Sequence, residues 1–304
     1  MIKRLLEKIR KFLVSPITTR LDSINYNLDS INNNIINTSY LIRIVNSNPV
    51  SQNYPVPRNI DSFGYKVYSQ NDEDGIINEI FKRIGTTDKT FVEFGVQDGL
   101  ESNCHFLLFN GWRGLWIDGS EENIKKLKEY FKKPISTQQL TAVNAFITVD
   151  NINELIGRNG FNGEIDLLSI DIDGNDYWIW QAIKCIQPRV VVIEYNAKFP
   201  PPCEWIMEYN PNHVWDESDK YGASLKSLEL LGDNLGYRLI GTNTCGVNAF
   251  FVRKELAKDL FPEPPTSEKL YHRFDNLKQI GFINDVYHVK HIKTYIGNEY
   301  STKQ

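Results

Sequence analysis

From residue 89 onward, short apolar runs alternate with segments whose apolar residues recur every three to four positions. The apolar runs predict strands at 90–94, 114–117, 139–147, 165–170, 189–194, 236–241 and 248–252. The helical periodicity predicts helices near 71–83, 102–110, 121–132, 151–157, 175–185 and 223–235. Such alternation is typical of an α/β protein with a doubly wound, mainly parallel sheet. The last two strands flank a turn of Gly, Asn and Thr, which predicts an antiparallel C-terminal hairpin.

The first 48 residues follow other patterns. Apolar residues at helical spacing in 2–13, with basic residues between them, predict an amphipathic helix that either contacts an anionic membrane surface or packs against protein. Residues 17–45 carry apolar positions at alternating spacings of three and four. This heptad pattern predicts a coiled coil and a homo-oligomer; the alternative is a helix lying on its own domain.

Proline-rich segments separate the remaining parts. Residues 49–60 read as a linker, 61–260 as the main domain, and 261–304 as a tail that packs on that domain.

Composition narrows the class of protein. The chain has 304 residues, of which 41% are hydrophobic and 24% charged, as in ordinary globular proteins. Residues 1–20 hold six basic residues and one acidic residue, so the rest is more acidic than the net charge of −4 suggests. An acidic body argues against nucleic-acid binding. The four cysteines form no C-x-x-C pair, and no uncharged apolar run is long enough to span a bilayer. We expect a cytoplasmic protein, with 2–13 as its one candidate contact with the inner face of the membrane.

The first chemical feature is the turn in FVEFGVQDG at 91–99. Its carboxylates and glycines are Glu93, Gly95, Asp98 and Gly99. The following strand ends at Asp118, with Ser120 close behind. Glycines let a backbone approach its ligand, and an acid at the tip of the next strand binds ribose hydroxyls. The pattern predicts a nucleoside site; a tight turn, with Asp118 capping the next helix, is the simpler alternative.

This turn differs from a dinucleotide-binding turn, which needs G-x-G-x-x-G so that a pyrophosphate can lie against a helix N-terminus. The turn lacks the middle glycine and carries acids that would repel phosphates. The expected ligand is therefore a cationic nucleoside without phosphates, and S-adenosylmethionine fits that description.

A second group of acids follows the fourth strand, in SIDIDGNDYW at 169–178. It contains Asp171, Asp173 and Asp176, and Glu194 ends the next strand. Ligands bind at this edge of open α/β sheets. Asp171, Asp173 and Glu194 form a candidate site for a divalent metal such as Mg. The alternatives are a general base, or N-cap and Asx-turn roles for Asp173 and Asp176.

The long segment 194–224 is rich in proline and aromatic residues and has no periodicity. It follows the fifth strand, so we expect it to cover the site. Its aromatic residues Trp205, Tyr209, Trp215 and Tyr221 can stack on sugar rings. His213 is the candidate general base, because imidazole titrates near neutrality. With Asp171 and Glu194 it makes up the candidate catalytic set; the alternative is that His213 only packs this loop.

The order of these motifs, together with GWRGLWIDGS and VVVIEYN, resembles class I S-adenosylmethionine-dependent methyltransferases, and within them the FkbM-like branch. The resemblance covers roughly 65–253. It implies a Rossmann-like methyltransferase fold, with Glu93, Gly95, Asp98 and Gly99 beside the methionine tail and Asp118 and Ser120 at the ribose. It also implies that Asn144 and Ala145 flank the adenine.

Together these features predict an O-methyltransferase acting on a carbohydrate hydroxyl, for example in a surface polysaccharide or its precursor. A hydroxyl is a weak acid and needs a base or a metal, which the acidic residues offer. The alternatives are a protein, lipid or small-molecule acceptor, a non-catalytic nucleoside-binding module assembled by the coiled coil, and a nicotinamide oxidoreductase, which the turn disfavours.

Overall fold

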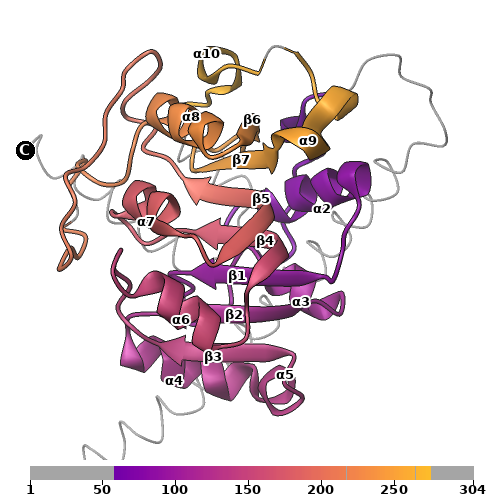
Figure 1. Cartoon of the computed structure of the whole chain (residues 1–304), viewed down its shortest axis with the longest axis vertical. Helices are drawn as coiled ribbons and strands as arrows, with labels where there is room; N and C mark the ends of the chain where they lie inside the picture. The colour runs from indigo at the N-terminus through magenta and orange to yellow at the C-terminus, as the bar shows by residue number, and fades with distance from the viewer. Residues whose placement is uncertain (1–57, 217, 264, 275–304) are drawn as a thin grey trace, which may run out of the picture. The chain divides into compact units, whose positions relative to one another are not determined.

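The computed structural model describes residues 58–216, 218–263 and 265–274 (Figure 1). The predicted amphipathic helix, the coiled coil and the end of the C-terminal tail lie outside the described residues. Within them, no helix combines the length and the apolar character that crossing a bilayer requires.

Seven strands form one sheet in the order β3-β2-β1-β4-β5-β7-β6 (Figure 1). They are β1 (Thr90–Phe94), β2 (Arg113–Asp118), β3 (Leu140–Asn144), β4 (Gly163–Ile170), β5 (Ile186–Glu194), β6 (Tyr237–Thr242) and β7 (Asn248–Arg253). Strands β1 to β5 pair in parallel, and β7 runs antiparallel to both of its neighbours. The predicted fold class is confirmed: a mainly parallel, Rossmann-like sheet with an antiparallel C-terminal pair.

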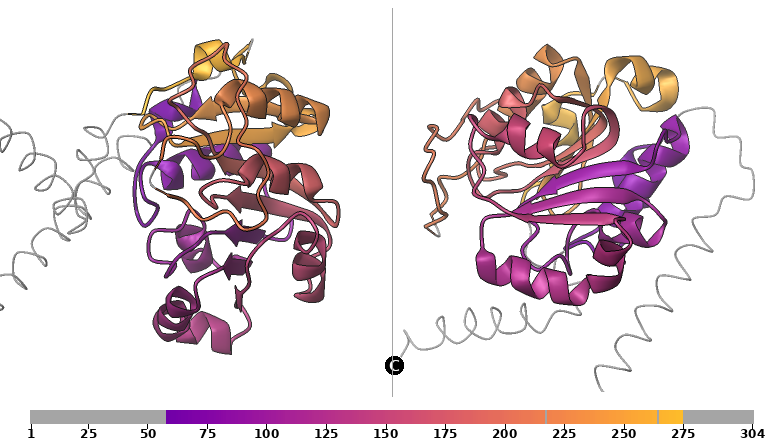
Figure 2. Two further views of the ribbon diagram at one scale, coloured as in Figure 1. Left: turned by 90° about the vertical axis from the view of Figure 1, so that its left-hand side faces the viewer. Right: turned by 60° about the horizontal axis from the view of Figure 1, so that its bottom comes forward.

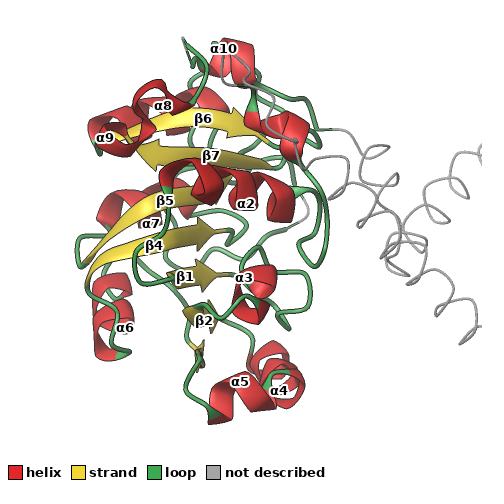
Figure 3. Cartoon of the chain, turned by 90° about the vertical axis from the view of Figure 1, so that its right-hand side faces the viewer, coloured by secondary structure: helices red, strands yellow, loops and turns green. Residues whose placement is uncertain are grey.

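Helices cover both faces of this sheet. The longer ones are α2 (Glu73–Ile84), α4 (Glu121–Tyr130), α6 (Ile152–Arg158), α7 (Asp176–Ala182) and α8 (Leu225–Asn234). Short elements are η1 (Ile60–Phe63), α3 (His105–Phe109), α5 (Lys132–Ser136), α9 (Lys254–Ala257), η2 (Lys258–Leu260) and α10 (Ser267–Leu270). Figure 3 shows α2 and α3 on the near side of the sheet and α7 behind it.

Two hydrophobic clusters fill the space between sheet and helices. Strand residues alternate between them: Phe91 packs with α2, α3 and α4, whereas Val92 packs with α6, α7 and α8. Both clusters consist of buried side chains. Because both faces of the parallel strands are covered, only the strand ends and the connecting loops remain to form a site.

Some predicted boundaries were wrong. The third strand was expected to reach Ile147, but it ends at Asn144, where the amide of Ala145 donates to the carbonyl of Asp118 at 3.1 Å. Ile147 lies in the loop after β3, but its side chain is buried. Its apolar character therefore reflects packing rather than strand pairing. The helix predicted from residue 102 begins at His105, because the two amides before it bond to the side chain of Glu93.

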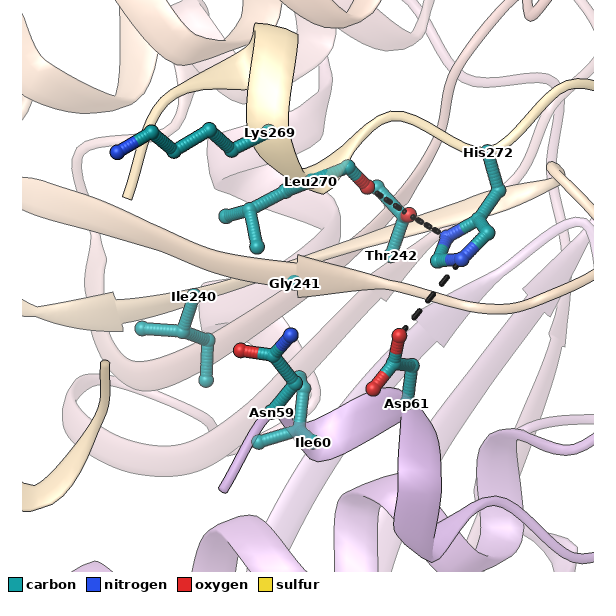
Figure 4. A pocket seen from close by; sticks show the side chains of 9 residues that line it. All are labelled: Asn59, Ile60, Asp61, Ile240, Gly241, Thr242, Lys269, Leu270 and His272. Atoms are coloured by element: carbon teal, nitrogen blue, oxygen red, sulfur yellow. Dashed lines mark hydrogen bonds and ion pairs between the residues drawn. The ribbon is translucent and has the colours of Figure 1, made fainter. Parts of the chain in front are cut away.

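The described part of the C-terminal segment lies along the edge strand β6. Thr242 donates to the carbonyl of Leu270 at 2.5 Å, and its oxygen faces Nδ1 of His272 at 2.9 Å. Nε2 of His272 lies 3.6 Å from Asp61 in η1, so the segment contacts both η1 and β6 (Figure 4). Tyr195, next to Glu194, donates to the carbonyl of His272 at 2.6 Å.

Candidate active site

The turn after β1 lies in direct contact with the end of β4. Gly95 has a φ of +70°, and a Cβ there would lie 1.6 Å from the carbonyl oxygen of Asp171. Its amide donates to the carbonyl of Ile117 at 3.0 Å. Only glycine fits between these backbones. The contact brings the predicted nucleoside turn and the predicted acidic group to one place on the sheet edge.

Glu93 is buried, with 3% of its surface exposed, and both of its oxygens have protein partners. Oε1 accepts from the amide of Asn103 at 2.7 Å. Oε2 accepts from the amide of Cys104 at 3.2 Å and from the indole of Trp116 at 2.7 Å. Burial raises the pKa of Glu93, and these hydrogen bonds act against the rise. The carboxyl group therefore fixes the start of α3 against the sheet; its contact with a cofactor stays a prediction.

Asp118 joins the first turn to the end of β2. Its Oδ2 accepts from the amide of Gln97, and its Oδ1 from the amide of Ser120, both at 2.8 Å. The cap of α4 is Ser120, whose hydroxyl accepts from the amide of Asn123 at 3.2 Å. Asp118 thus does not cap the helix. A carboxylate has about four acceptor positions, so Asp118 retains acceptor capacity beyond these two bonds, and its contact with a ribose stays a prediction.

The other two residues of the turn have local roles. Oδ1 of Asp98 accepts from the amide of Leu100 at 3.2 Å. A Cβ on Gly99 would lie 2.8 Å from the ring of Trp116, so this glycine permits close packing. These contacts shape the turn and leave Asp98 partly exposed beside it.

The end of β3 lies against Asp118, and the placement of Asn144 and Ala145 beside an adenine stays a prediction. The side-chain amide of Asn144 donates to the carbonyl of Asp118 at 3.0 Å, in addition to the bond from Ala145. The sequence analysis missed Phe146, which is 47% exposed and lies 3.3 Å from the Cβ position of Gly119. The sequence held no clear signal for it, because Phe146 fell inside the strand predicted at 139–147. Its open ring offers a stacking surface next to the ribose-binding candidate.

The carboxylates of Asp171, Asp173 and Glu194 gather at the ends of β4 and β5. One oxygen from each lies within 4.8 Å of the others. Burial, and then the charges of Asp173 and Asp176, raise the pKa of Asp171 well above its usual range. Burial, and then Asp171, do the same for the pKa of Glu194. Among the described residues, no lysine or arginine pairs with Asp171 or Glu194. Burial also raises the pKa of Asp173, and His213 acts against that rise.

Two acids of this group differ in how they are bonded. Asp176 accepts from the amides of Ile172 and Gly174, both at 2.9 Å, and so closes the turn. Oε2 of Glu194 is buried and has no hydrogen-bond partner. Asp176 is therefore structural, but it is neither the N-cap of α7, which is Asn175, nor an Asx-turn residue, because the two amides precede it in the chain. Glu194 retains capacity for a proton or a ligand.

His213 lies over this turn, as expected of a residue in the covering loop. Its Nε2 is 3.0 Å from the carbonyl oxygen of Asp173. A carbonyl only accepts, so Nε2 carries the hydrogen and donates. Any basic function of His213 must therefore use Nδ1, and its direct contact is with backbone.

The aromatic residues of the loop have different surroundings. Trp205 stacks on Phe199 with ring centroids 4.2 Å apart. The hydroxyl of Tyr209 accepts from the amide of Val149 at 3.3 Å. Trp215 is 47% exposed, and its indole donates to the carbonyl of Ser218 at 3.0 Å. Of these three side chains, Trp215 is the one most available to stack on a ligand.

A buried polar network, which no sequence pattern predicted, lies at the start of α2. Oε1 of Glu73 accepts from the side-chain amides of Asn71, Asn243 and Asn248, at 3.3, 2.8 and 3.0 Å. Asn248 stands directly opposite Glu194 in the β5–β7 pair, so the network lies beside the acidic group. The signal was the run of four polar residues, 71–74, at the start of the predicted helix.

A scan against protein-family models and a search of curated proteins gave no match. Solved structures do match. An O-methyltransferase from Bacillus cereus in complex with SAH is 12% identical, covers 72% of this chain and 90% of its own, and has a TM-score of 0.42. TrmK of M. capricolum, in complex with S-adenosyl-homocysteine, is 12% identical, with 74% and 84% covered and a TM-score of 0.39. A SAM dependent methyltransferase from Aquifex aeolicus is 12% identical, with 58% and 89% covered and a TM-score of 0.35. Likeness at this level carries no argument about activity, so the function is argued from the site.

Proposed function

We propose that this chain is an S-adenosylmethionine-dependent methyltransferase that methylates a carbohydrate hydroxyl. The observation that carries the proposal is the contact between Gly95 and Asp171, which joins the predicted nucleoside turn to the group of Asp171, Asp173 and Glu194. A methyl donor and a hydroxyl acceptor must lie side by side, with a base at the acceptor. At this edge of the sheet, the turn after β1 would bind the methyl donor, and the carboxylates beside it would supply the base.

The nucleoside part rests on Asp118 and Phe146. Asp118 keeps acceptor capacity for ribose hydroxyls, and Phe146 offers its ring for the adenine. S-adenosylmethionine supplies an activated methyl group when bound. The surrounding carboxylates favour its positive charge, whereas the pyrophosphate of NAD would meet repulsion.

At the acceptor, Asp171 is the residue that receives the hydroxyl proton. Its raised pKa makes it a stronger base than an ordinary carboxylate, which suits a weakly acidic hydroxyl. The motif order that resembles the FkbM-like branch and the open ring of Trp215 support a sugar as the acceptor. A protein, lipid or other small-molecule acceptor is the second candidate.

A divalent cation fits the same carboxylates. Asp171, Asp173 and Glu194 offer only oxygen ligands, which Mg²⁺ prefers, and Glu194 has a buried oxygen without a partner. When bound, the cation would lower the pKa of an acceptor hydroxyl. Calorimetric titration with Mg²⁺, in the wild type and in Asp173→Asn, tests this part separately from methyl transfer.

Calorimetry with S-adenosylmethionine and with NAD tests the cofactor. We expect binding of the first and none of the second. Phe146→Ala removes an exposed side chain and should weaken binding about tenfold without unfolding the protein. Asp118→Ala should abolish binding. The control is Asp259→Ala, which removes an exposed carboxylate distant in sequence from the site and should bind as the wild type does. Binding of NAD, or unchanged affinity in both site variants, would overturn the assignment.

A further inference from the structure

The turn between β4 and α7 is bonded to the covering loop at three successive residues. The bonds are His213 Nε2 to Asp173 O (3.0 Å), Gly222 N to Gly174 O (3.1 Å), Asn175 Nδ2 to Asn210 O (2.7 Å) and Asn210 N to Asn175 Oδ1 (3.2 Å). Loop residues far apart in sequence therefore converge on this one turn. Figure 2 shows the loop between β5 and α8 beside the strand ends.

The backbone of Asp173 is in an uncommon conformation. Its φ is +56°, in the left-handed region, which is uncommon for any residue other than glycine. Inside the turn, the carboxylate of Asp176 accepts hydrogen bonds from the amides of Ile172 and Gly174, on either side of Asp173. Outside the turn, His213 holds the carbonyl of Asp173 itself. The loop thus supplies part of the constraint on a residue whose carboxylate belongs to the acidic group.

Gly174 makes the contact with His213 possible. A Cβ at this position would lie 2.2 Å from Cδ2 and 2.5 Å from Nε2 of His213, so the ring lies against the glycine. The φ of Gly174 is not in the left-handed region. Its backbone would therefore accept alanine, and the His213 ring is the obstacle.

We propose that His213 and Asn175 are positioning residues, through which the covering loop holds Asp173 in its left-handed conformation and assembles the carboxylates of Asp171, Asp173 and Glu194. His213 then acts through its bond to a backbone carbonyl rather than as a base. When the loop leaves the turn, Asp173 relaxes and the carboxylate group separates. The assignment of a reaction to this group rests on the proposed function, but the mechanical link does not.

Hydrogen exchange of the full chain, followed by mass spectrometry, tests the link without any substrate. In His213→Ala and in Gly174→Ala, amides of residues 172–176 and of residues 205–224 should exchange together, about fivefold or more faster than in the wild type. In the double variant, Gly174→Ala should add nothing to His213→Ala, because the obstacle is gone. Asn175→Ala removes the two side-chain bonds to Asn210 and should speed exchange of the same amides independently of His213. Faster exchange confined to the loop, or fully additive effects in the double variant, would overturn the proposal.

Kinetics then separate positioning from basicity. Gln has a donor that can replace Nε2 of His213 but cannot act as a base near neutral pH. His213→Gln should retain most of kcat, His213→Ala should lose about tenfold or more, and both should bind S-adenosylmethionine as the wild type does. Equal loss in both variants would show that His213 is a base and refute its positioning role. If the wild type transfers no methyl group, the exchange experiment still decides the link.

Discussion

Replacing Asp72 by asparagine should make the free energy of unfolding less sensitive to a rise in pH from about 5 to about 8. Asp72 is 2% exposed at the start of α2. Its Oδ2 accepts from the hydroxyl of Thr244 at 3.0 Å, whereas its Oδ1 is buried without a partner. Burial, and then the charge of Glu73, raise the pKa of Asp72 from 3.8 to about 7. The folded protein therefore favours the neutral form of this side chain.

The size and sign of the effect follow from that shift. A carboxyl group whose pKa is higher in the folded state stabilises the fold fully below its unfolded pKa, and this contribution is lost as the pH rises through the folded value. A rise from 3.8 to about 7 corresponds to about 4 kcal/mol in the free energy of unfolding. Between about pH 5 and about pH 8, the same relation gives a loss of about 3 kcal/mol. The asparagine side chain of the Asp72→Asn variant would carry no charge at any of these pH values.

Urea unfolding at a series of pH values measures this difference. The wild type should lose about 3 kcal/mol more than Asp72→Asn between about pH 5 and about pH 8. Asp259→Asn, which neutralises an exposed carboxylate, should follow the wild type. If the wild type and Asp72→Asn gave parallel profiles, Asp72 would not titrate in this range and the argument from burial would fail.

Three further variants test other parts of the structure. Gly95→Ala places a methyl group against the carbonyl of Asp171 and should cost about 3 kcal/mol or more, measured by urea unfolding, so a stability equal to that of the wild type would contradict the close contact. Asp171→Asn should lower kcat about 10²-fold to 10⁴-fold while S-adenosylmethionine binding by calorimetry is kept, and intact turnover would exclude Asp171 as the base. Deletion of residues 1–48 should reduce an oligomer to monomers in light scattering, and an unchanged number of subunits would reject the coiled coil.

The central strands were predictable because they are buried on both faces. A run such as Val190 to Ile193 is apolar throughout, as expected of a strand covered by helices on both sides of the sheet. Boundaries were harder, because burial continues past the hydrogen-bonded part, as Ile147 shows. The start of α3 depends on a side chain of β1, a pairing that no local pattern contains.

The residue types of the site were predictable, but their partners were not. Asp171, Asp173 and Glu194 follow parallel strands, so the sheet edge brings them together. The network of Glu73 joins residues 170 and 175 positions apart, Asn243 and Asn248, and depends on the position of β7 in the sheet. Short-range patterns carry no information about such a pair.

The electrostatics of the site explain which ligands it suits. Asp171 and Glu194 lie close together, and the pKa of each is raised first by burial and then by the charges of the neighbouring carboxylates. A phosphate would add to this repulsion. A sulfonium or a divalent cation would relieve it, because its positive charge would stabilise the ionised forms of Asp171 and Glu194. This preference comes from the group of Asp171, Asp173 and Glu194 itself, because Glu93 of the neighbouring turn already bonds to protein through both oxygens.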